Sequence, residues 1–223
     1  MDKQIDELTG LILESELNTE MEALIAKGVE FSLIAIDIDN LLITNRDYGR
    51  EAGDAVFKLI AQNIKSIFPN PCLGFRGTRD AFEILMPGYS KEMAFLKAEE
   101  LRKVVYETKL DYFSTEGKPM AQAISAGVSS YPEDGSRPAD IFRRADGALL
   151  RAKKSGRNLV CLAREEKLIP KTSHYTHAQL EKLSLISEVI NVGEAALLRE
   201  ALDDLLKKYD MDNHINEIYQ KQA

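Results

Sequence analysis

Long apolar runs are missing from this sequence. No segment reaches the ~18 to 20 uninterrupted apolar residues of a membrane span, and the opening stretch MDKQIDELTG has no signal-peptide pattern. Proline and glycine are scarce, at 7 and 13 of 223 residues, while 44% of residues are hydrophobic and 29% charged. That composition is typical of a folded protein rather than a disordered or fibrous one. We therefore expect a soluble, cytoplasmic protein that makes no membrane contact.

Cysteine, histidine and net positive charge are also in short supply. The two cysteines, Cys72 and Cys161, are too few and too far apart for a disulfide framework or a zinc site, so we predict small core residues. His174 and His177 would form a metal pair without a third ligand, and we predict surface or DNA-facing side chains instead. The net charge of −7 excludes a uniformly basic nucleic-acid binder and leaves room only for a local basic strip.

Buried strands and amphipathic helices alternate along most of the chain. Apolar runs predict strands within 31–40 and 121–132, a closing strand at 157–163, and two short strands around a turn at 75–86. Apolar residues at three- and four-residue spacing predict helices at 49–68, 90–107 and 137–156. The alternation predicts an α/β body over residues 1–163, with a small appendage over 164–223.

Four motifs of this body occur in the order and spacing of a known family. They are DELTGL, DIDNLLITNRDYGREAGD, SAGVSSYPEDG and ADGALLRAKKSGRN. Residues 4–163 resemble the GGDEF domain of bacterial diguanylate cyclases, an α+β palm related to nucleotide cyclases and polymerases. The resemblance implies that each protomer binds one GTP and that two GTPs are joined across a dimer into cyclic di-GMP.

The resemblance also implies a Mg²⁺ site. Attack of a 3′-hydroxyl on an α-phosphorus requires divalent ions held by carboxylates. Asp37 matches the family's first metal ligand, with the Ile38 carbonyl beside it, and Asp80 matches the carboxylate within the signature. An acid at a strand end can also serve as a cap, but the surrounding motif favours metal binding at Asp37.

Four further residues match the family's nucleotide contacts. Asn45 and Asp54 stand where the family recognises guanine, whose N1 and N2 hydrogens need an acceptor and whose O6 needs a donor. Lys153 and Arg157 match its triphosphate contacts. Taken singly, the first two also suit a turn or helix cap, and the last two also offset a helix dipole. The motif as a whole favours nucleotide binding.

The signature itself departs from the family pattern. Where the family has Gly-Gly-Asp/Glu-Glu-Phe, this chain has Thr78, Arg79, Asp80, Ala81 and Phe82. Glycines allow positive φ and a close approach of backbone to ribose and phosphate, so Thr78 and Arg79 should obstruct that approach. Ala81 removes a carboxylate from a step where catalytic groups typically contribute ~10² to 10⁴ fold. We expect no catalytic residues here, and Arg79 either contacts phosphate or is a solvated turn residue.

Two other family features are replaced. Leu42 stands where a family lysine reaches the distal phosphates. Pro69 and Cys72 stand where product-inhibited members carry an Arg-x-x-Asp pair. The usual inhibitory site for cyclic di-GMP is therefore expected to be absent.

The appendage resembles a ribbon-helix-helix module, a dimeric DNA-binding fold of small bacterial regulators. Residues 164–175 are predicted to be a linker or isolated strand, and helices are predicted at 176–190 and 194–209, with capping-box spacing between Thr176 and Gln179. In that family paired strands read bases in the major groove. The candidate DNA-reading residues are Lys171, Ser173 and Tyr175, or the opposite face with Thr172, His174 and Thr176.

The charge of this appendage does not favour DNA. Residues 164–223 carry eight Lys or Arg against eleven Asp or Glu, a net charge of −3. Because phosphate contacts supply most non-specific DNA affinity, the cations would need to concentrate on the strand face. The alternative is a helical hairpin that serves only to dimerise.

Three functional hypotheses follow. The first is a dimeric regulator whose catalytically inactive GGDEF-like domain binds GTP or cyclic di-GMP, with Mg²⁺, and biases DNA binding. The second is a weakly active diguanylate cyclase that uses Asp37 and Asp80. The third is a signalling scaffold that binds neither nucleotide nor DNA.

Overall fold

The chain divides into two compact units. The computed structural model describes residues 3–114, 117–164 and 171–209. Contacts between residues separate Met1–Glu165 from Glu166–Ala223. Among the described residues, no helix is both long enough and apolar enough to cross a membrane.

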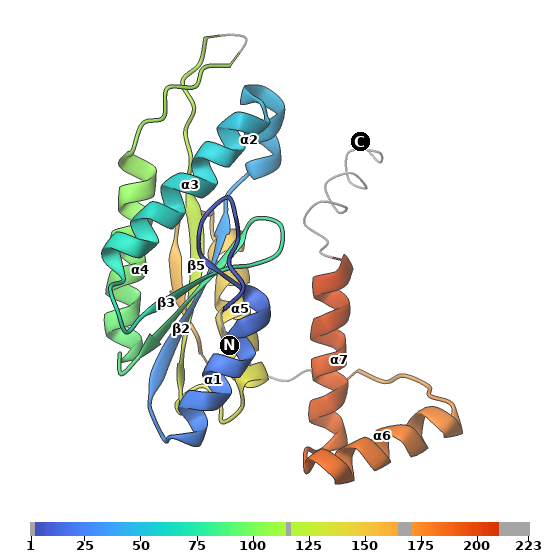
Figure 1. Ribbon diagram of the computed structural model, residues 1–223. Coiled ribbons are helices and arrows are strands. Elements are labelled where there is room, and N and C mark those ends of the chain that lie inside the picture. Colours follow the sequence, from blue (N-terminus) through green and yellow to red (C-terminus); the bar gives the residue numbers. More distant parts are fainter. Residues whose placement is uncertain (1–2, 115–116, 165–170, 210–223) are drawn as a thin grey trace. The chain divides into compact units, whose positions relative to one another are not determined.

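A six-stranded sheet forms the centre of the first unit (Figure 1). Its strands run in the order β1-β3-β4-β2-β5-β6, and the central strand β2 is antiparallel to both β4 and β5. The outer pairs β1 with β3 and β5 with β6 are parallel. The bounds are β1 Ile12–Leu13, β2 Phe31–Ile38, β3 Leu73–Arg76, β4 Ala81–Pro87, β5 Ile124–Tyr131 and β6 Val160–Leu162.

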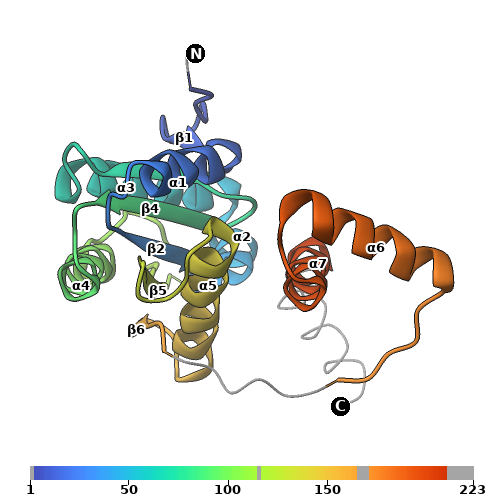
Figure 2. The ribbon, with the colours of Figure 1, turned by 90° about the horizontal axis from the view of Figure 1, so that it is seen from below.

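Helices cover both faces of this sheet. Helices α3 and α4 pack on one face and α1 and α5 on the other (Figures 1 and 2). Successive side chains of a strand point to opposite faces, so Ile34 and Ile36 of β2 join the core under α3 and α4, whereas Leu33 and Ala35 join the core under α1 and α5. The bounds are α1 Leu17–Ala26, α2 Leu41–Tyr48, α3 Arg50–Ile67, α4 Lys91–Glu107 and α5 Pro138–Lys154.

Helix α5 lies unusually close to β5. A Cβ added to Gly127 of β5 would collide with the backbone of α5 at Ala145 and Leu149. Glycine at this position therefore lets the helix backbone approach the sheet directly. The close contact fixes the position of the last turn of α5, which carries Lys153.

The strands and helices expected from periodicity are confirmed, and three elements were missed. Strand β1 has only two residues, and α1 buries only Leu17 and Met21. Helix α2 begins after Asn40, which has a left-handed φ of 59°, and it buries only Leu41 and Thr44. Such sparse apolar faces give little helical periodicity for a sequence argument to detect.

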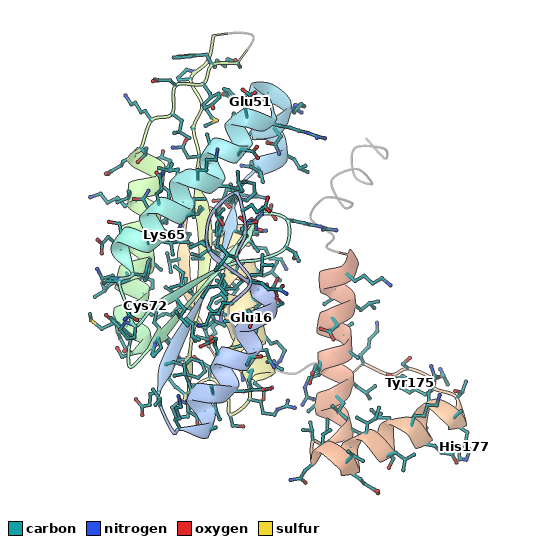
Figure 3. The ribbon with its side chains drawn as sticks, viewed as in Figure 1. Glu16, Glu51, Lys65, Cys72, Tyr175 and His177 are labelled. Atoms are coloured by element: carbon teal, nitrogen blue, oxygen red, sulfur yellow. The ribbon has the colours of Figure 1, made fainter. Side chains whose placement is uncertain are left out.

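The second unit contains two helices in contact, α6 His177–Ile190 and α7 Glu194–Tyr209. The capping box is confirmed, because the Thr176 hydroxyl accepts from the Gln179 backbone and the Gln179 side chain accepts from the Thr176 backbone. Tyr175 and His177 flank this cap (Figure 3). Residues 171–176 form neither helix nor strand within the single chain. Residues 165–170 of the predicted linker or strand lie outside the described residues.

Candidate nucleotide and metal site

Two acids and a lysine meet at the end of the central strand. Asp37 is the second-last residue of β2 and pairs in register with Ala81 of β4. Lys153, from the last turn of α5, places its Nζ 2.9 Å from Oδ2 of Asp37. Asp80 lies in the turn just before β4. It is held beside the end of β2 because the Ile38 N–H donates to the Asp80 carbonyl at 3.2 Å. Three residues predicted to bind metal or phosphate are thus brought together from three elements.

The carboxyl group of Asp37 lies in an environment that disfavours its ionised form. The pKa of the Asp37 carboxyl is raised to about 7, first by burial and then by the negative charge of Asp80, with a smaller contribution from Asp39. Lys153 acts in the opposite direction through its charge and hydrogen bond. Burial disfavours an ionised carboxylate, and a neighbouring carboxylate disfavours it further. One ammonium group therefore does not fully offset the negative charge gathered here.

The donor set fits Mg²⁺. This ion prefers hard oxygen ligands and is usually held by one or two carboxylates together with substrate phosphates and water. Asp37 and Asp80 supply the two carboxylates, and the Ile38 carbonyl follows Asp37 in the chain. Burial is the main cause of the raised pKa of Asp37, and the second cause, the negative charge of Asp80, is one that a divalent cation would offset.

A neighbouring acid, Asp39, has a structural role that sequence reasoning missed. It is buried, its Oδ1 accepts from the Ser125 hydroxyl at 2.8 Å, and its Oδ2 accepts from the Asn158 backbone N–H at 2.8 Å. The Asn158 amide oxygen in turn accepts from Arg102 of α4 at 2.9 Å. Asp39 thus ties the chain after β2 to β5 and to the segment after α5. Only its position in the motif, two residues after Asp37, offered a signal.

That segment carries Arg157, the second predicted phosphate contact. Gly156, Arg157 and Asn158 all have positive φ, at 116°, 65° and 45°. The Arg157 N–H donates to the Ala152 carbonyl at 3.1 Å, closing the end of the helix. Arg157 is exposed. Its backbone is therefore fixed beside the corner of Asp37 and Lys153 while its side chain faces solvent.

The predicted guanine contacts lie on α2 and α3. The Asn45 side chain rests against Gly53, where an added Cβ would collide with the Asn45 amide. Asp54 is the next residue along α3. Gly49, with φ 87°, makes the turn between the two helices, and its N–H donates to the Asn45 carbonyl at 3.1 Å. The close helix pair thus brings Asn45 beside the residue that precedes Asp54.

The signature positions form the turn between β3 and β4. The Gly77 N–H donates to the Ala81 carbonyl at 3.0 Å and the Ala81 N–H to the Thr78 carbonyl at 3.2 Å. Arg76 closes the turn from inside, because its guanidinium donates to the carbonyls of Gly77, Arg79 and Ala81. The turn is therefore held by a cation from its own strand.

Arg76 is itself held by aromatic rings. Its guanidinium carbon lies 4.3 Å from the ring centroid of Phe57 and 5.1 Å from that of Phe82. Burial lowers the pKa of Arg76, and nearby acids, Asp6 first, raise it. Stacking on rings suits a guanidinium, which is planar and weakly hydrated. Neither Arg76 nor its rings were singled out in the sequence as turn-forming residues.

Arg79 occupies the left-handed region. Its φ of 57° is one that glycine adopts freely and other residues adopt at a cost of ~1 to 2 kcal/mol. The second position of the signature thus has the backbone conformation that a glycine would permit, with an arginine side chain attached.

The other replaced positions are also placed. Leu42, in the first turn of α2, is 60% exposed and carries no charge toward a phosphate. Cys72 is buried, and burial raises the pKa of its thiol. The position of the family's inhibitory aspartate is therefore filled by a core side chain, whose location on the loop before β3 is labelled in Figure 3.

Residues 3–159 match the family model described as diguanylate cyclase, GGDEF domain. The chain belongs to the GGDEF family. Diguanylate cyclase A of Treponema denticola is 37% identical over 138 residues, which cover 62% of this chain and 36% of that protein. The chain spans less than half of the first two curated relatives it matches. GGDEF cyclase domains generally use Mg²⁺, in agreement with the donor set at Asp37.

Solved GGDEF structures share this fold. The coiled coil and GGDEF domain of DgcB from Caulobacter crescentus, in complex with c-di-GMP, matches with a TM-score of 0.64 and 27% identity, over 71% of this chain and 85% of that one. The active GGEEF domain of a diguanylate cyclase from Vibrio cholerae matches with a TM-score of 0.61 and 30% identity, over 69% and 96%. The α/β palm expectation is confirmed.

Residues 167–210 match the ribbon-helix-helix domain. Within them, Lys171, Ser173 and Tyr175 lie in the irregular segment before α6 and are exposed, as are Thr172, His174 and Thr176. His177 pairs with Glu181 at 3.2 Å on the helix surface. Among the described residues, no cluster of three metal-ligating side chains occurs, so the two histidines lack a third ligand there.

Proposed function

We propose that this chain is a dimeric regulator whose GGDEF unit, Met1–Glu165, binds a guanine nucleotide with Mg²⁺ and whose ribbon-helix-helix module binds DNA. The observation that carries the proposal is the contrast at one corner of the sheet. Asp37, Asp80 and Lys153 meet in an arrangement that suits a metal ion and phosphate, while the adjoining turn carries Arg79 and Ala81 in place of a glycine and a carboxylate.

In the bound state, Asn45 and Asp54 would hydrogen-bond the base, and Lys153 and Arg157 would contact the phosphates. Mg²⁺ between Asp37 and Asp80 would neutralise the triphosphate charge and the mutual repulsion of the two acids. Because Leu42 carries no charge, residues at the end of α5 would make the contacts to the distal phosphates. These residues hold and orient a nucleotide without any need for the turn to move.

Joining two GTP molecules places further requirements on the turn between β3 and β4. Its backbone must approach ribose and phosphate closely, and Arg76 locks that backbone by bonding three of its carbonyls. Thr78 and Arg79 add side chains where glycine would leave space. Ala81, paired with Asp37 across the strands, brings no carboxylate. We therefore place the chain among binding members of the family rather than efficient cyclases.

The C-terminal module would act on DNA as a dimer. In the proposed assembly the segment around Lys171, Ser173 and Tyr175 pairs with its copy from a second chain and enters the major groove. Such pairing accounts for the lack of strand structure in residues 171–176 of a single chain, because a strand at that place has its partner in another molecule.

The test is calorimetric titration of the full chain with GTP and, separately, with cyclic di-GMP, both in Mg²⁺. Binding should weaken strongly in Asn45→Ala and in Asp54→Ala and stay unchanged in Asn63→Ala, a matched amide on α3 that bonds the Leu59 carbonyl. Unchanged binding in the first two variants would exclude this nucleotide site. Selection from a random duplex pool should enrich one sequence, and a pool without enrichment would exclude specific DNA recognition.

Slow cyclase activity is the second candidate, and the retained pair Asp37 and Asp80 favours it. Chromatography of the GTP mixture after prolonged incubation separates the two. Binding without a new dinucleotide supports a sensor. Cyclic di-GMP formation that is lost in Asp80→Asn would show that the two carboxylates suffice for catalysis.

A further inference from the structure

An open pocket lies at the β6 edge of the GGDEF unit, and none of the residues assigned to nucleotide lines it. It has a volume of about 500 Å³ and is lined by parts of α4, α5 and the edge strand β6. We call it the β6 pocket. Its lining residues are Phe95, Arg151, Lys154, Ser155, Val160, Cys161, Leu162 and Arg164.

The charge of this lining is opposite to that of the chain. Arg151, Lys154 and Arg164 contribute three cations, and no acid among the residues that the structure describes lines the pocket, although the whole chain carries −7. Lys154 and Arg164 are exposed, and Arg151 donates to the Leu162 carbonyl at 3.0 Å. In an acidic protein such a local concentration of positive charge focuses an electrostatic field that attracts anions.

The basic surface continues along α5. Arg144 lies two helical turns before Arg151 and therefore on the same side of the helix, and it donates to the Arg164 carbonyl at 2.9 Å. From Arg144 to Lys154 the helix rises ~15 Å, at ~1.5 Å per residue. That is the scale of several phosphates along a nucleic-acid strand rather than of one small anion.

A structural explanation covers part of this pattern. Cations in the last turn of a helix offset its dipole, which accounts for Arg151 and Lys154 without any ligand. It does not account for Arg164, which follows β6 and belongs to no helix. Nor does the helix dipole account for the pocket itself, whose lining combines these cations with the apolar side chains of Phe95, Val160 and Leu162.

The acidity of the C-terminal module indicates what this surface does. Residues 164–223 carry a net charge of −3, whereas DNA affinity depends largely on phosphate neutralisation. We propose that the β6 pocket contacts backbone phosphates of the DNA duplex that the module binds, an inference that rests on the proposed DNA-binding function. The GGDEF unit would then supply non-specific affinity, and the module would supply sequence recognition.

The test measures salt dependence with the full chain. A fluorescent duplex of about 30 base pairs is titrated between about 50 and 200 mM salt. The slope of log K against log salt is negative and becomes shallower by ~0.9 for each lost phosphate contact, so the double variant Lys154→Gln with Arg164→Gln should be shallower than wild type by about 1.8. The control, Lys27→Gln with Lys58→Gln, removes two exposed cations that do not line the pocket and should keep the wild-type slope.

The outcomes separate the inference from the function on which it rests. Wild-type protein that binds no duplex overturns the DNA-binding proposal itself. Wild-type binding with an unchanged slope in the Lys154 and Arg164 variant overturns the pocket assignment alone, as does an equal change of slope in the control. Titration with GTP and Mg²⁺ should be the same in that variant as in wild type. Lost GTP affinity without a slope change would assign the pocket to free nucleotide phosphates and overturn the DNA contact.

Discussion

Lys153 and Asp37 form a partly buried ion pair, with 2.9 Å between Nζ and Oδ2 and side chains 18% and 13% exposed. In the family's chemistry these two residues have different partners, phosphate for the lysine and metal for the aspartate. In this structure each residue of the pair neutralises the other, and under the proposed function the pair would have to separate when Mg²⁺ and nucleotide bind.

The first prediction concerns Lys153→Met. Removal of the ammonium should tighten Mg²⁺ binding in the absence of nucleotide by about tenfold, or ~1.4 kcal/mol, because Lys153 competes for Asp37. The same variant should bind GTP with Mg²⁺ more weakly, because a phosphate contact is lost. Because Lys153 lowers the pKa of Asp37, which is about 7 with the lysine present, calorimetry at about pH 9 is needed so that the carboxylate ionises in the variant as well.

Lys154→Met is the matched control, since it removes one charge from the next, exposed residue. It should leave Mg²⁺ affinity as in wild type. Equal tightening in both variants would mean that overall charge, and not the ion pair, governs metal binding.

The second prediction concerns stability and pH. The folded pKa of Asp37, about 7, exceeds the ordinary value of 3.8 for an aspartate, so the folded state holds a proton that the unfolded state releases. Stability from this group is full below the lower value and declines as pH rises through the upper one. The groups that face Asp37 are Asp80, Lys153 and Asp39. Between pH 5 and 8 the unfolding midpoint of wild type should fall by a few degrees relative to Asp37→Asn, since ~1 kcal/mol shifts it by ~2 to 4 °C.

Circular dichroism melts measure this difference. Asp111→Asn removes an exposed charge and should track wild type at every pH. A constant gap between wild type and Asp37→Asn from pH 5 to 8 would contradict the assignment of the titration to Asp37.

The sequence predicted most of the fold because β2 and α3 carry strong apolar patterns. Eight consecutive residues of β2 are buried or nearly so, and α3 buries Val56, Ile60 and Ile64 at helical spacing. Helices α1 and α2 escaped prediction because each buries only two residues. Helix α1 packs on α5 and β4, which are remote in sequence, whereas α2 packs on α3, which follows it directly.

The candidate site was only partly accessible to sequence reasoning. Asp37, Asp80 and Lys153 were placed by motif, but their mutual contact depends on the register of β2 with β4 and on the close approach of α5 at Gly127. The roles of Asp39 and Arg76 were not found. Asp39 acts on segments that are remote in sequence, and Arg76 acts on the carbonyls of its own turn, and no residue spacing encodes either kind of contact.

The third prediction isolates the backbone conformation at Arg79. Arg79→Gly should be more stable than Arg79→Ala by about 1 kcal/mol, because both remove the side chain and only glycine adopts φ near 57° without cost. Urea unfolding of the two variants gives the difference directly. Equal stabilities would mean that the turn relaxes to another conformation once the arginine is gone.

Substitutions in this turn also test whether it blocks catalysis. If Arg79 only obstructs the approach of nucleotide to the turn, the triple variant Thr78→Gly, Arg79→Gly, Ala81→Glu should form more cyclic di-GMP than wild type. Arg79→Ala alone should not, because it restores neither glycine nor carboxylate. Chromatography of the reaction products measures cyclic di-GMP formation in both variants. A triple variant as inactive as wild type would place the defect elsewhere, with Leu42 the next position to restore.

The last prediction concerns the apolar surface of the C-terminal module. Leu185, Ile186 and Val189 of α6 are 62%, 51% and 84% exposed in the single chain, and Leu202 and Leu205 of α7 are 53% and 49% exposed. Apolar side chains gathered on two short helices mark an interaction surface. Burial of each in a dimer would contribute ~1.5 to 3 kcal/mol. Leu185→Glu should therefore shift the chain from dimer to monomer in light scattering, and DNA affinity should fall with it.

Lys182→Glu provides the control, because it adds acid at an exposed polar position of the same helix. It should remain dimeric. Nucleotide titration should be unchanged in Leu185→Glu, since Asn45, Asp54 and Lys153 all belong to the GGDEF unit. If both variants stayed dimeric, the second copy would have to be held by another surface, and the pairing of residues 171–176 across chains would lose its physical basis.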